Sequence, residues 1–456
     1  MRIGYGITEI TPRGKLTLAG FASRLNQPMK GVFDSIFVKS LFAEQGGQPI
    51  LVMDYDLLGI GAEQLECIQK RLDKEINTPR KNRIFICTHT HSAPAAITTI
   101  GCGIISDDYV KFLADCTAES VLMAISNASE ARYQYGELNV PGLSRNRRNL
   151  LSDGRVVMVP APSDNIIKAG PVCDTFKFVR FVDINGNPIV GLINWAAHAC
   201  VNAEHYVSAD YPGELCSLLE EQHGFPFMFI QGGAGNINLF FHLMNREEML
   251  KNANRIFEQI KVIPYGEQNE VRRFILSSPE VRLDFKNITN EKELKCFKNG
   301  MVEIAETGNG KETFIKELAN ILNVPPGKTP DNKMLRYIAR TQVDWCDYLA
   351  TARFKKNIKV PLSLWAFDDI LFCFIGGEIF YETVMRIEKS ATLLEVVTAG
   401  YASPQLGYIL PEEAVAEGGY EAAFAYRFYG YPSVFEGSSE DRIVEAICKE
   451  INKMNK

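Results

Sequence analysis

A short apolar run that ends in two histidines constrains the fold of this chain more than any other feature. Residues 84–86 read Ile-Phe-Ile, follow charged residues and precede Pro94, and so predict a buried β-strand. Side chains two apart in a strand share a face, so we expect His89 and His91 to project side by side from its end. Such a pair forms half of a metal site, couples one ligand to a proton-handling neighbour, or only packs the strand end through hydrogen bonds.

Size and charge narrow the class of protein. The chain has 456 residues, of which 46% are hydrophobic and 23% charged, as is usual for globular proteins of one to three domains. The net charge is −6, and the most basic cluster (Arg145, Arg147 and Arg148) is too small for a duplex footprint, so we expect no nucleic-acid partner. No apolar segment is long enough to predict a transmembrane helix.

The N-terminus and the cysteines indicate a reducing compartment. Residues 1–6 lack the apolar core and cleavage site of a signal peptide. The eleven cysteines include no Cys-x-x-Cys pair, and several, such as Cys87, Cys200 and Cys373, lie in apolar runs as small buried hydrophobes. We therefore expect a cytoplasmic protein.

Strand-like and helix-like patterns alternate, which predicts an α/β (mixed α+β) fold of mixed β-sheets flanked by helices. A strong turn signal, Asn-Gly-Asn at 185–187, joins two strands into a hairpin. Residues 286–330 are largely polar and predict an insertion or small subdomain within a single unit spanning 1–456. The predicted strands cover 49–54, 174–182, 188–195, 225–231, 369–376 and 393–399, and the predicted helices cover 62–76, 107–127, 245–263, 330–355 and 439–455.

Further candidate site residues follow other apolar strands. His198 ends one strand, and Glu378 lies just past another, where it could also be a helix-start carboxylate. Asp210 could cap a helix or orient a ligand histidine, and Asp54, at the end of the strand over 49–54, is a second candidate for that orienting role.

A glycine-rich loop at 231–238, Gln-Gly-Gly-Ala-Gly-Asn-Ile-Asn, follows a predicted strand. Its backbone N–H groups could converge on an anion or oxyanion, with Gly233, Gly235 and Asn236 as the residues involved. The loop is not a P-loop, because no Gly-Lys-Ser/Thr follows. Glycine-rich turns after strands are also common as purely structural features.

Taken in order, these motifs resemble the neutral, non-lysosomal ceramidases, a family of zinc amidases that cut the N-acyl bond of ceramide. The similarity runs from the Ile-Thr-Glu-Ile-Thr-Pro stretch at 7–12 to about Tyr429. Residues 88–94, Thr-His-Thr-His-Ser-Ala-Pro, come close to the family's Thr-His-Thr-His-Ser-Gly-Pro. The separation of Tyr408 and Tyr420, and their position after Glu378, also fit the family pattern.

The resemblance implies a ceramidase-like catalytic fold and one Zn²⁺ ion. It implies that the zinc ligands are His89, His198, Glu378 and Tyr408. It further implies that the substrate is contacted beside the metal by His91, Arg147 and Tyr420. Two imidazoles, a carboxylate and a phenolic oxygen suit zinc, which can lower the pKa of a bound water for attack on an amide.

Two departures from the family pattern bear on the substrate. Asn238 stands where the family loop has a serine; asparagine can donate a hydrogen bond to an oxyanion but is not a nucleophile. The C-terminal β-sandwich module of ceramidases is not expected, because the chain ends soon after Tyr429.

We therefore expect a zinc-dependent hydrolase of a linear amide, acting on a small N-acylated substrate, with a lipid as one option. Two alternatives remain open. One is a binding or regulatory homologue that has lost turnover, and the other is a metal-dependent esterase or phosphatase in which Arg147 and the glycine loop bind the anion.

Overall fold

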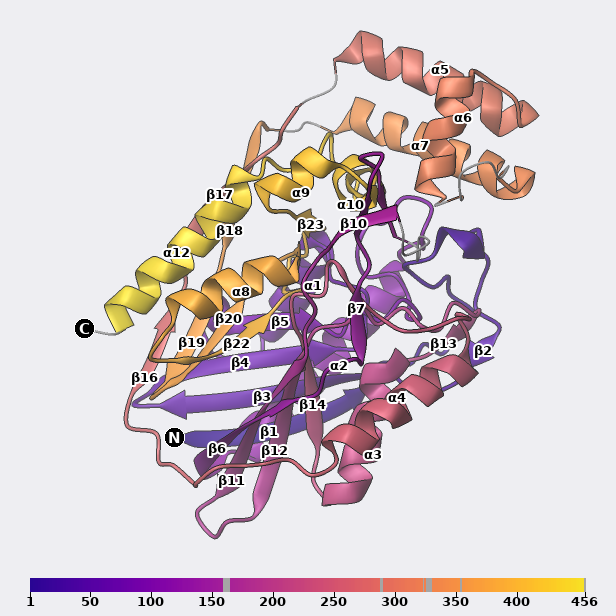
Figure 1. Ribbon diagram of the computed structural model, residues 1–456. Helices are drawn as coiled ribbons and strands as arrows, with labels where there is room; N and C mark the ends of the chain where they lie inside the picture. The colour runs from indigo at the N-terminus through magenta and orange to yellow at the C-terminus, as the bar shows by residue number, and fades with distance from the viewer. Residues whose placement is uncertain (159–164, 288–289, 323, 325–329, 353–354, 455–456) are drawn as a thin grey trace.

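The protein is described by a computed structural model that covers residues 1–158, 165–287, 290–322, 324, 330–352 and 355–454. Its main feature is an eight-stranded mixed sheet (Figure 1). In spatial order the strands are β14 (Phe227–Gln231), β12 (Pro188–Trp195), β11 (Thr175–Asp183), β6 (Ser129–Asn139), β1 (Arg2–Glu9), β3 (Phe37–Gln45), β4 (Gln48–Tyr55) and β5 (Arg83–Cys87).

A second, four-stranded sheet packs on one face of the first. Its order is β16 (Phe274–Ser277), β19 (Ser363–Phe367), β20 (Ile370–Phe374) and β22 (Glu395–Ala399). The seam is an apolar core in which Val179 and Leu192 of the large sheet meet Phe372 and Val397 of the small one. Strands such as β5, β14 and β20 are nearly continuous apolar runs because both of their faces are buried.

Helices cover the two outer faces, which gives four layers in the order helix, sheet, sheet, helix. The large sheet is covered by α1 (Ala62–Leu72), α2 (Asp107–Ser126), α3 (Asp210–His223) and α4 (Arg246–Ile260). The small sheet is covered by α8 (Tyr381–Ser390) and α12 (Ser438–Met454). The predicted mixed α/β class is confirmed.

A separate group of helices lies apart from these layers, at the upper right of Figure 1. It consists of α5 (Glu291–Thr307), α6 (Glu312–Ile321) and α7 (Asn332–Thr351), packed around Met301, Ile304 and Leu335. The polar stretch predicted as an insertion, 286–330, contains α5 and α6; its positions 288–289, 323 and 325–329 lie outside the described residues, as do 353–354 of the helix predicted over 330–355 and 455 of the predicted terminal helix.

Short elements complete the chain. They are η1 (Ala22–Arg24), β2 (Gly31–Val32), η2 (Arg80–Asn82), β7 (Ser144–Asn146), β8 (Asn149–Leu151), β9 (Val156–Val157), β10 (Ile166–Ala169), β13 (Tyr206–Val207), β15 (Ile237–Leu239), β17 (Glu280–Asp284), β18 (Asn357–Pro361), β21 (Glu378–Ile379), β23 (Tyr408–Ile409), α9 (Glu412–Glu417), α10 (Tyr420–Ala423) and α11 (Ala425–Phe428).

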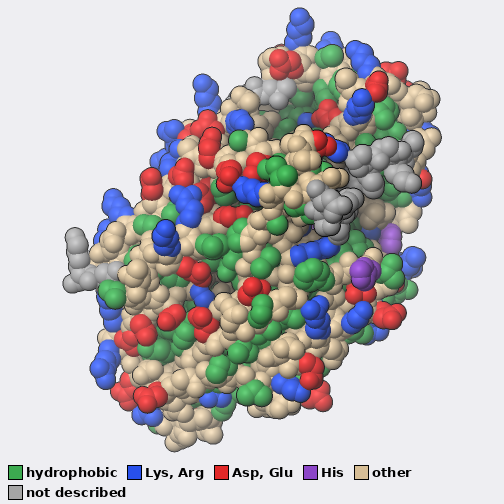
Figure 2. Space-filling model, in the orientation of Figure 1, with side chains coloured by type: hydrophobic (Ala, Val, Ile, Leu, Met, Phe, Trp, Pro, Cys, Tyr) green, Lys and Arg blue, Asp and Glu red, His purple; other side chains and the backbone are tan. Residues whose placement is uncertain are grey.

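Two surface properties bear on partners. Acidic and basic side chains are interspersed on the face shown in Figure 2. Across the described part of the chain, no helix has both the length and the apolar character that a membrane span requires.

Candidate metal centre

The large sheet curls until its two edge strands, β14 and β5, come into contact. The Gln231 side chain, at the end of β14, fastens this closure: its Nε2 donates to the Thr88 carbonyl beyond β5 (3.0 Å) and to the Ala197 carbonyl beyond β12 (2.8 Å). The segments that follow β5 and β12 therefore meet, and they carry His89 and His198.

The histidine pair is not arranged as strand alternation predicted. Strand β5 ends at Cys87, so both His89 and His91 lie in the loop beyond it. His89 has a left-handed backbone (φ 63°), which turns its ring away from the regular pleat. The two rings still meet, edge to face, with centroids 4.9 Å apart. The prediction of proximity is confirmed, but the physical reason given for it is wrong.

Backbone carbonyls fix the tautomers of two histidines. His89 donates from Nδ1 to the Leu58 carbonyl (2.6 Å), and His198 donates from Nδ1 to the Ala234 carbonyl (2.9 Å). A carbonyl can only accept, so each ring presents its Nε2 lone pair elsewhere. The two Nε2 atoms face each other at 3.1 Å. Burial, with the nearby charge of Arg147, holds the pKa of His198 well below its usual value and keeps the ring neutral.

Glu378 adds a third electron-rich atom at the same point. Its Oε2 lies 3.3 Å from His89 Nε2 and 3.6 Å from His198 Nε2. Among the residues that the structure describes, Oε2 has no hydrogen-bond partner, although the side chain is 1% exposed. Burial opposes the charged form, the Tyr429 hydrogen bond and the Arg147 charge favour it, and the pKa of Glu378 lies below its ordinary value.

This arrangement fits a metal ion. Three lone-pair atoms within 3.1–3.6 Å of one another repel unless a cation lies between them. Zinc bonds of about 2.0–2.2 Å in tetrahedral directions place neighbouring ligand atoms roughly 3.3–3.6 Å apart, close to this spacing. The buried group His89, His91 and His198, whose ligand atoms all lie within 4.8 Å of one another, can hold a metal ion.

His91 stands beside the three converging atoms. Its Nδ1 lies 3.2 Å from the Gly20 carbonyl, and its Nε2 is buried with no hydrogen-bond partner in the described structure. Burial, together with the nearby His89 and Arg24, holds the pKa of His91 well below its usual value. The structure thus leaves one neutral imidazole nitrogen available next to the candidate metal position.

Tyr408 is brought to the site by a short parallel pairing, β21 with β23, in which Glu378 and Tyr408 are direct partners. The phenol oxygen accepts a hydrogen bond from Arg147 Nη2 (2.7 Å). Burial raises the pKa of this phenol well above its usual value, and the Arg147 charge opposes that rise.

Arg147 forms hydrogen bonds within the protein, and its expected contact with substrate stays a prediction. Besides Tyr408, it donates from Nε to Glu421 Oε1 (2.9 Å), while Arg148 Nη1 donates to Glu421 Oε2 (2.7 Å). Glu421 is fully buried and lies on α10 next to Tyr420, whose ring meets the Tyr408 ring edge-on at 6.2 Å between centroids. Tyr420 therefore borders the site beside the tyrosine predicted as a ligand.

Several N–H groups of the glycine loop are occupied by backbone carbonyls. The N–H groups of Gly232, Ala234 and Gly235 donate to the backbone carbonyls of Trp195, Gly232 and Ile379, respectively. A side chain at Gly233 would collide with Val384, and one at Gly235 would lie 2.9 Å from the Glu378 and Ile379 carbonyl oxygens. These glycines allow close packing against α8 and β21. The N–H of Gly235 is occupied, whereas the anion-binding role predicted for Gly233 stays a prediction.

Asn236 likewise has a structural role in place of the predicted one. Its Oδ1 accepts from the Tyr381 N–H (3.0 Å), and its Nδ2 donates to Glu382 (2.6 Å), which ties the loop to the start of α8. Asn238 lies on β15 opposite Arg145 of β7, and its Oδ1 is buried without a hydrogen-bond partner in the described structure. Its predicted role as a donor to substrate stays a prediction.

Neither acid expected behind the ligands reaches a histidine. Asp210 is the first residue of α3, after the N-cap Ala209, so it is not the predicted N-cap. Its carboxylate accepts from the backbone N–H groups of Asn202 (2.9 Å) and Tyr211 (2.7 Å) and so ties the preceding loop to the start of α3. Asp54 pairs across the sheet with Lys39, and its Oδ1 has no hydrogen-bond partner among the described residues. Carbonyl oxygens occupy the histidine Nδ1 positions that these acids would need.

Sequence reasoning missed three residues that shape the site. Tyr429 donates to Glu378 Oε1 (2.5 Å), and the buried Tyr401 ring lies 4.2 Å from the His89 ring between centroids. Arg24, 2% exposed, donates to the His91 carbonyl and, at 2.9 Å, to Ser92 Oγ. No motif surrounds these residues, so no local signal could have identified them.

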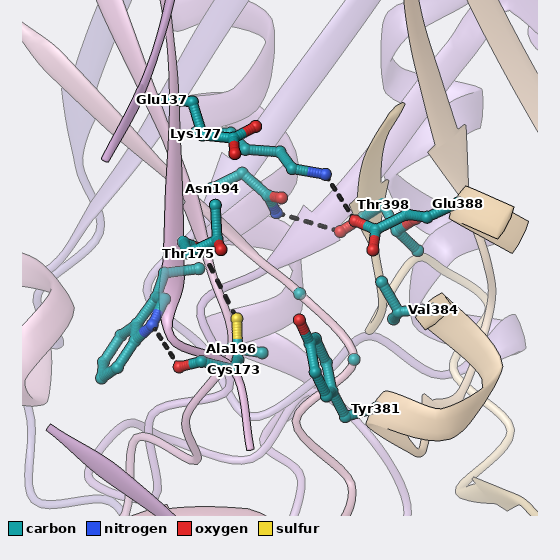
Figure 3. Close-up of a pocket in the computed structure, with 13 residues that line it drawn as sticks. Glu137, Cys173, Thr175, Lys177, Asn194, Ala196, Tyr381, Val384, Glu388 and Thr398 are labelled. Carbon is teal, nitrogen blue, oxygen red and sulfur yellow. Dashed lines mark hydrogen bonds and ion pairs between the residues drawn. The ribbon is translucent and has the colours of Figure 1, made fainter. Parts of the chain in front are cut away.

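A cavity of about 150 Å³ lies on the other side of the glycine loop (Figure 3). Gly232 and Gly233 line it, but none of the three site histidines does. Its polar groups are largely satisfied: Lys177 pairs with Glu388 and donates to the Val396 carbonyl (2.7 Å). Its size suits a few ordered water molecules.

Comparisons with known proteins address the fold. No protein-family model matches the chain, and no curated protein sequence matches it either. Among solved structures, a ceramidase complexed with C2 superposes with a TM-score of 0.70 at 16% identity, over 100% of this chain and 75% of that one. The neutral ceramidase of Pseudomonas aeruginosa gives the same TM-score at 18% identity, over 99% and 74%. The chain has the neutral ceramidase fold, as its motifs predicted.

Proposed function

We propose that this protein is a zinc-dependent hydrolase that cleaves a linear N-acyl amide bond. The observation that carries the proposal is the convergence of His89 Nε2, His198 Nε2 and Glu378 Oε2 within 3.1–3.6 Å, with both imidazole tautomers fixed. Tyr408, held beside Glu378 by strand pairing, is proposed as the fourth ligand. The likeness in fold to ceramidases supports an amide as the bond that is cut.

The zinc ion and the side chains would have different roles in the reaction. Bound zinc would act as a Lewis acid that polarises the amide and acidifies water. The neutral His91, with a free Nε2, accepts a proton during attack and passes it to the departing amine. Tyr420 is proposed to orient the substrate. Arg147 acts indirectly, because its positive charge favours the ionised form of Tyr408.

The likeness in fold to ceramidases favours an amide over a phosphate ester. Arg147 donates from Nε to Glu421 and from Nη2 to Tyr408, so these two N–H groups are not available to a phosphate. The N–H groups of Gly232, Ala234 and Gly235 are committed as well. We propose a small N-acylated amine as substrate, with ceramide as one member of the class to be tested.

The test combines metal analysis with a substrate panel. Wild-type protein is expected to hold about one zinc per chain, and His198→Ala to hold almost none, because the fixed Nε2 is lost. His242→Ala changes an exposed histidine and is the matched control. N-acylated amino acids, N-acylated amino sugars, ceramide, carboxylic esters and phosphate monoesters are then compared.

Hydrolysis of an amide that requires zinc would support the proposal. Turnover of only esters or phosphates would reject the amide assignment. Full zinc retention in His198→Ala would reject the metal centre. A zinc-loaded wild type that hydrolyses nothing across the panel would favour the binding or regulatory alternative.

A further inference from the structure

The two oxygens of the Glu378 carboxylate have different surroundings. Oε1 accepts a hydrogen bond from the Tyr429 hydroxyl at 2.5 Å. Oε2 has no hydrogen-bond partner in the described structure and faces His89 Nε2 at 3.3 Å. A phenol O–H facing a carboxylate can only donate to it, so one oxygen is occupied and the other is left free.

Tyr429 reaches this position because Gly407 makes room for its ring. Gly407 has a left-handed backbone (φ 69°), and a Cβ there would lie 2.5 Å from the Tyr429 ring. The Gly407 carbonyl in turn accepts from the Glu378 N–H (2.8 Å). The same glycine thus positions the tyrosine ring and the backbone of the glutamate.

The Tyr429 ring also packs against a cluster that supports His89. Tyr429 packs against an apolar cluster that contains Leu58 and Ile97, and the Leu58 carbonyl accepts from His89 Nδ1. Tyr429 therefore contacts the supports of two proposed ligands at once. No other hydroxyl that the structure describes donates to Glu378.

We infer that Tyr429 is a positioning residue that restricts Glu378 to binding the metal through Oε2 alone. Carboxylates bind metal ions through one or both oxygens, and the choice changes the coordination number. A hydrogen bond to Oε1 withholds that oxygen and fixes the plane of the carboxylate. This inference rests on the proposed metal centre and adds to it how the glutamate ligand is controlled.

The experiment removes only the hydroxyl. Tyr429→Phe and wild type are loaded with Co²⁺, whose visible absorption weakens as the coordination number rises, and affinity is measured by competition with a chelator. We expect weaker absorption in Tyr429→Phe, since the freed Oε1 joins the ion. We also expect affinity to fall by about 10- to 100-fold, as for other groups that orient metal ligands. Tyr431→Phe is the control, because the Tyr431 ring packs against Phe285 and Phe435.

Each outcome decides the matter. Weaker absorption in Tyr429→Phe, with Tyr431→Phe like wild type, supports the inference. An unchanged spectrum in a metal-loaded, folded Tyr429→Phe overturns it and leaves the proposed function standing. Equal changes in both variants also overturn it, since a general loss of a buried hydroxyl would then explain them. Failure of wild type to bind any divalent metal overturns both the inference and the proposed function.

Discussion

The directions of single hydrogen bonds decide what the site residues can do. The Nδ1–H groups of His89 and His198 donate to backbone carbonyls, so the Nε2 atoms of the two rings, 3.1 Å apart, each carry a lone pair. One carboxylate oxygen of Glu378 accepts a hydrogen bond from Tyr429. Each of these three proposed ligands is thus left with one free atom, and the three free atoms lie within 3.1–3.6 Å of one another. The supporting contacts therefore determine which atoms a cation could bind.

At the same scale, Glu421 is expected to be critical for stability. It is fully buried and is the shared counter-charge of Arg147 and Arg148. Glu421→Gln keeps the shape but leaves Arg147 without its carboxylate partner and Arg148 with Glu417 alone. Removing one partner of a buried pair costs about 3–5 kcal/mol of unfolding free energy. Urea unfolding measures this loss.

The control for this prediction is Glu413→Gln on the neighbouring helix α9. Glu413 is 75% exposed and pairs with Lys168, so its loss is expected to cost no more than about 1 kcal/mol. Equal costs for the two substitutions would show that Glu421 is not a buried counter-charge.

Sequence could identify the proposed ligands but not their supports. His89, His198 and Glu378 each follow an apolar strand, so local pattern and motif order pointed to them. Tyr429 and Glu421 act across 51 and 274 residues of sequence, respectively, and no local pattern encodes such contacts. Asp210 was misjudged because an acid near a helix start suits either an N-cap or an orienting role, and the structure gives it neither.

At the scale of elements, the glycine loop after β14 lets neighbouring elements pack closely. Gly235 lies against β21, and its N–H donates to the Ile379 carbonyl at 2.9 Å. Gly235→Ala would press a methyl group onto the Glu378 and Ile379 carbonyls. We expect a loss of roughly 1–3 kcal/mol in unfolding free energy, together with weaker metal binding as Glu378 shifts.

Gly14→Ala is the matched control for this prediction, because a Cβ at Gly14 meets nothing within 4 Å. Its effect should stay within about 0.5 kcal/mol. Denaturant titration and metal competition measure the two consequences separately. A fully stable Gly235→Ala with unchanged affinity would mean that the loop is not tightly packed.

Elements with strong local signals were predicted well. The hairpin β11–β12 forms around its Asn-Gly turn, and α4 begins after Asn245, whose side chain accepts from the Glu248 N–H. Helix α1 ends at Leu72 and not at 76. The loop after β5 could not be predicted, because the left-handed backbone of His89 is stabilised by contacts from distant segments.

At the scale of the whole molecule, pH should affect stability through a buried acid, Asp56. Burial raises its pKa from 3.8 to about 6, a rise that Lys39 partly opposes. Between these values the folded protein binds a proton that the unfolded chain does not, so stability from this group rises as pH falls. Above about pH 6 the buried carboxylate is charged, and it lowers the free energy of unfolding by its full amount.

Asp56→Asn removes the titrating group and tests whether wild-type stability rises as pH falls. Relative to the variant, wild type should gain stability between about pH 8 and about pH 5, measured by urea unfolding at each pH. Asp108→Asn, at an exposed position on α2, should run parallel to wild type. A wild-type-to-variant difference that stays constant across this range would contradict the assignment.

The closure of the large sheet by Gln231 implies an order of events during synthesis. His89 and His198 are 109 residues apart, and Glu378 emerges from the ribosome later than both. A partly synthesised chain therefore lacks part of the proposed ligand set, and the proposed ion would enter only after the last layers have docked. Metal occupancy would then report that folding is complete.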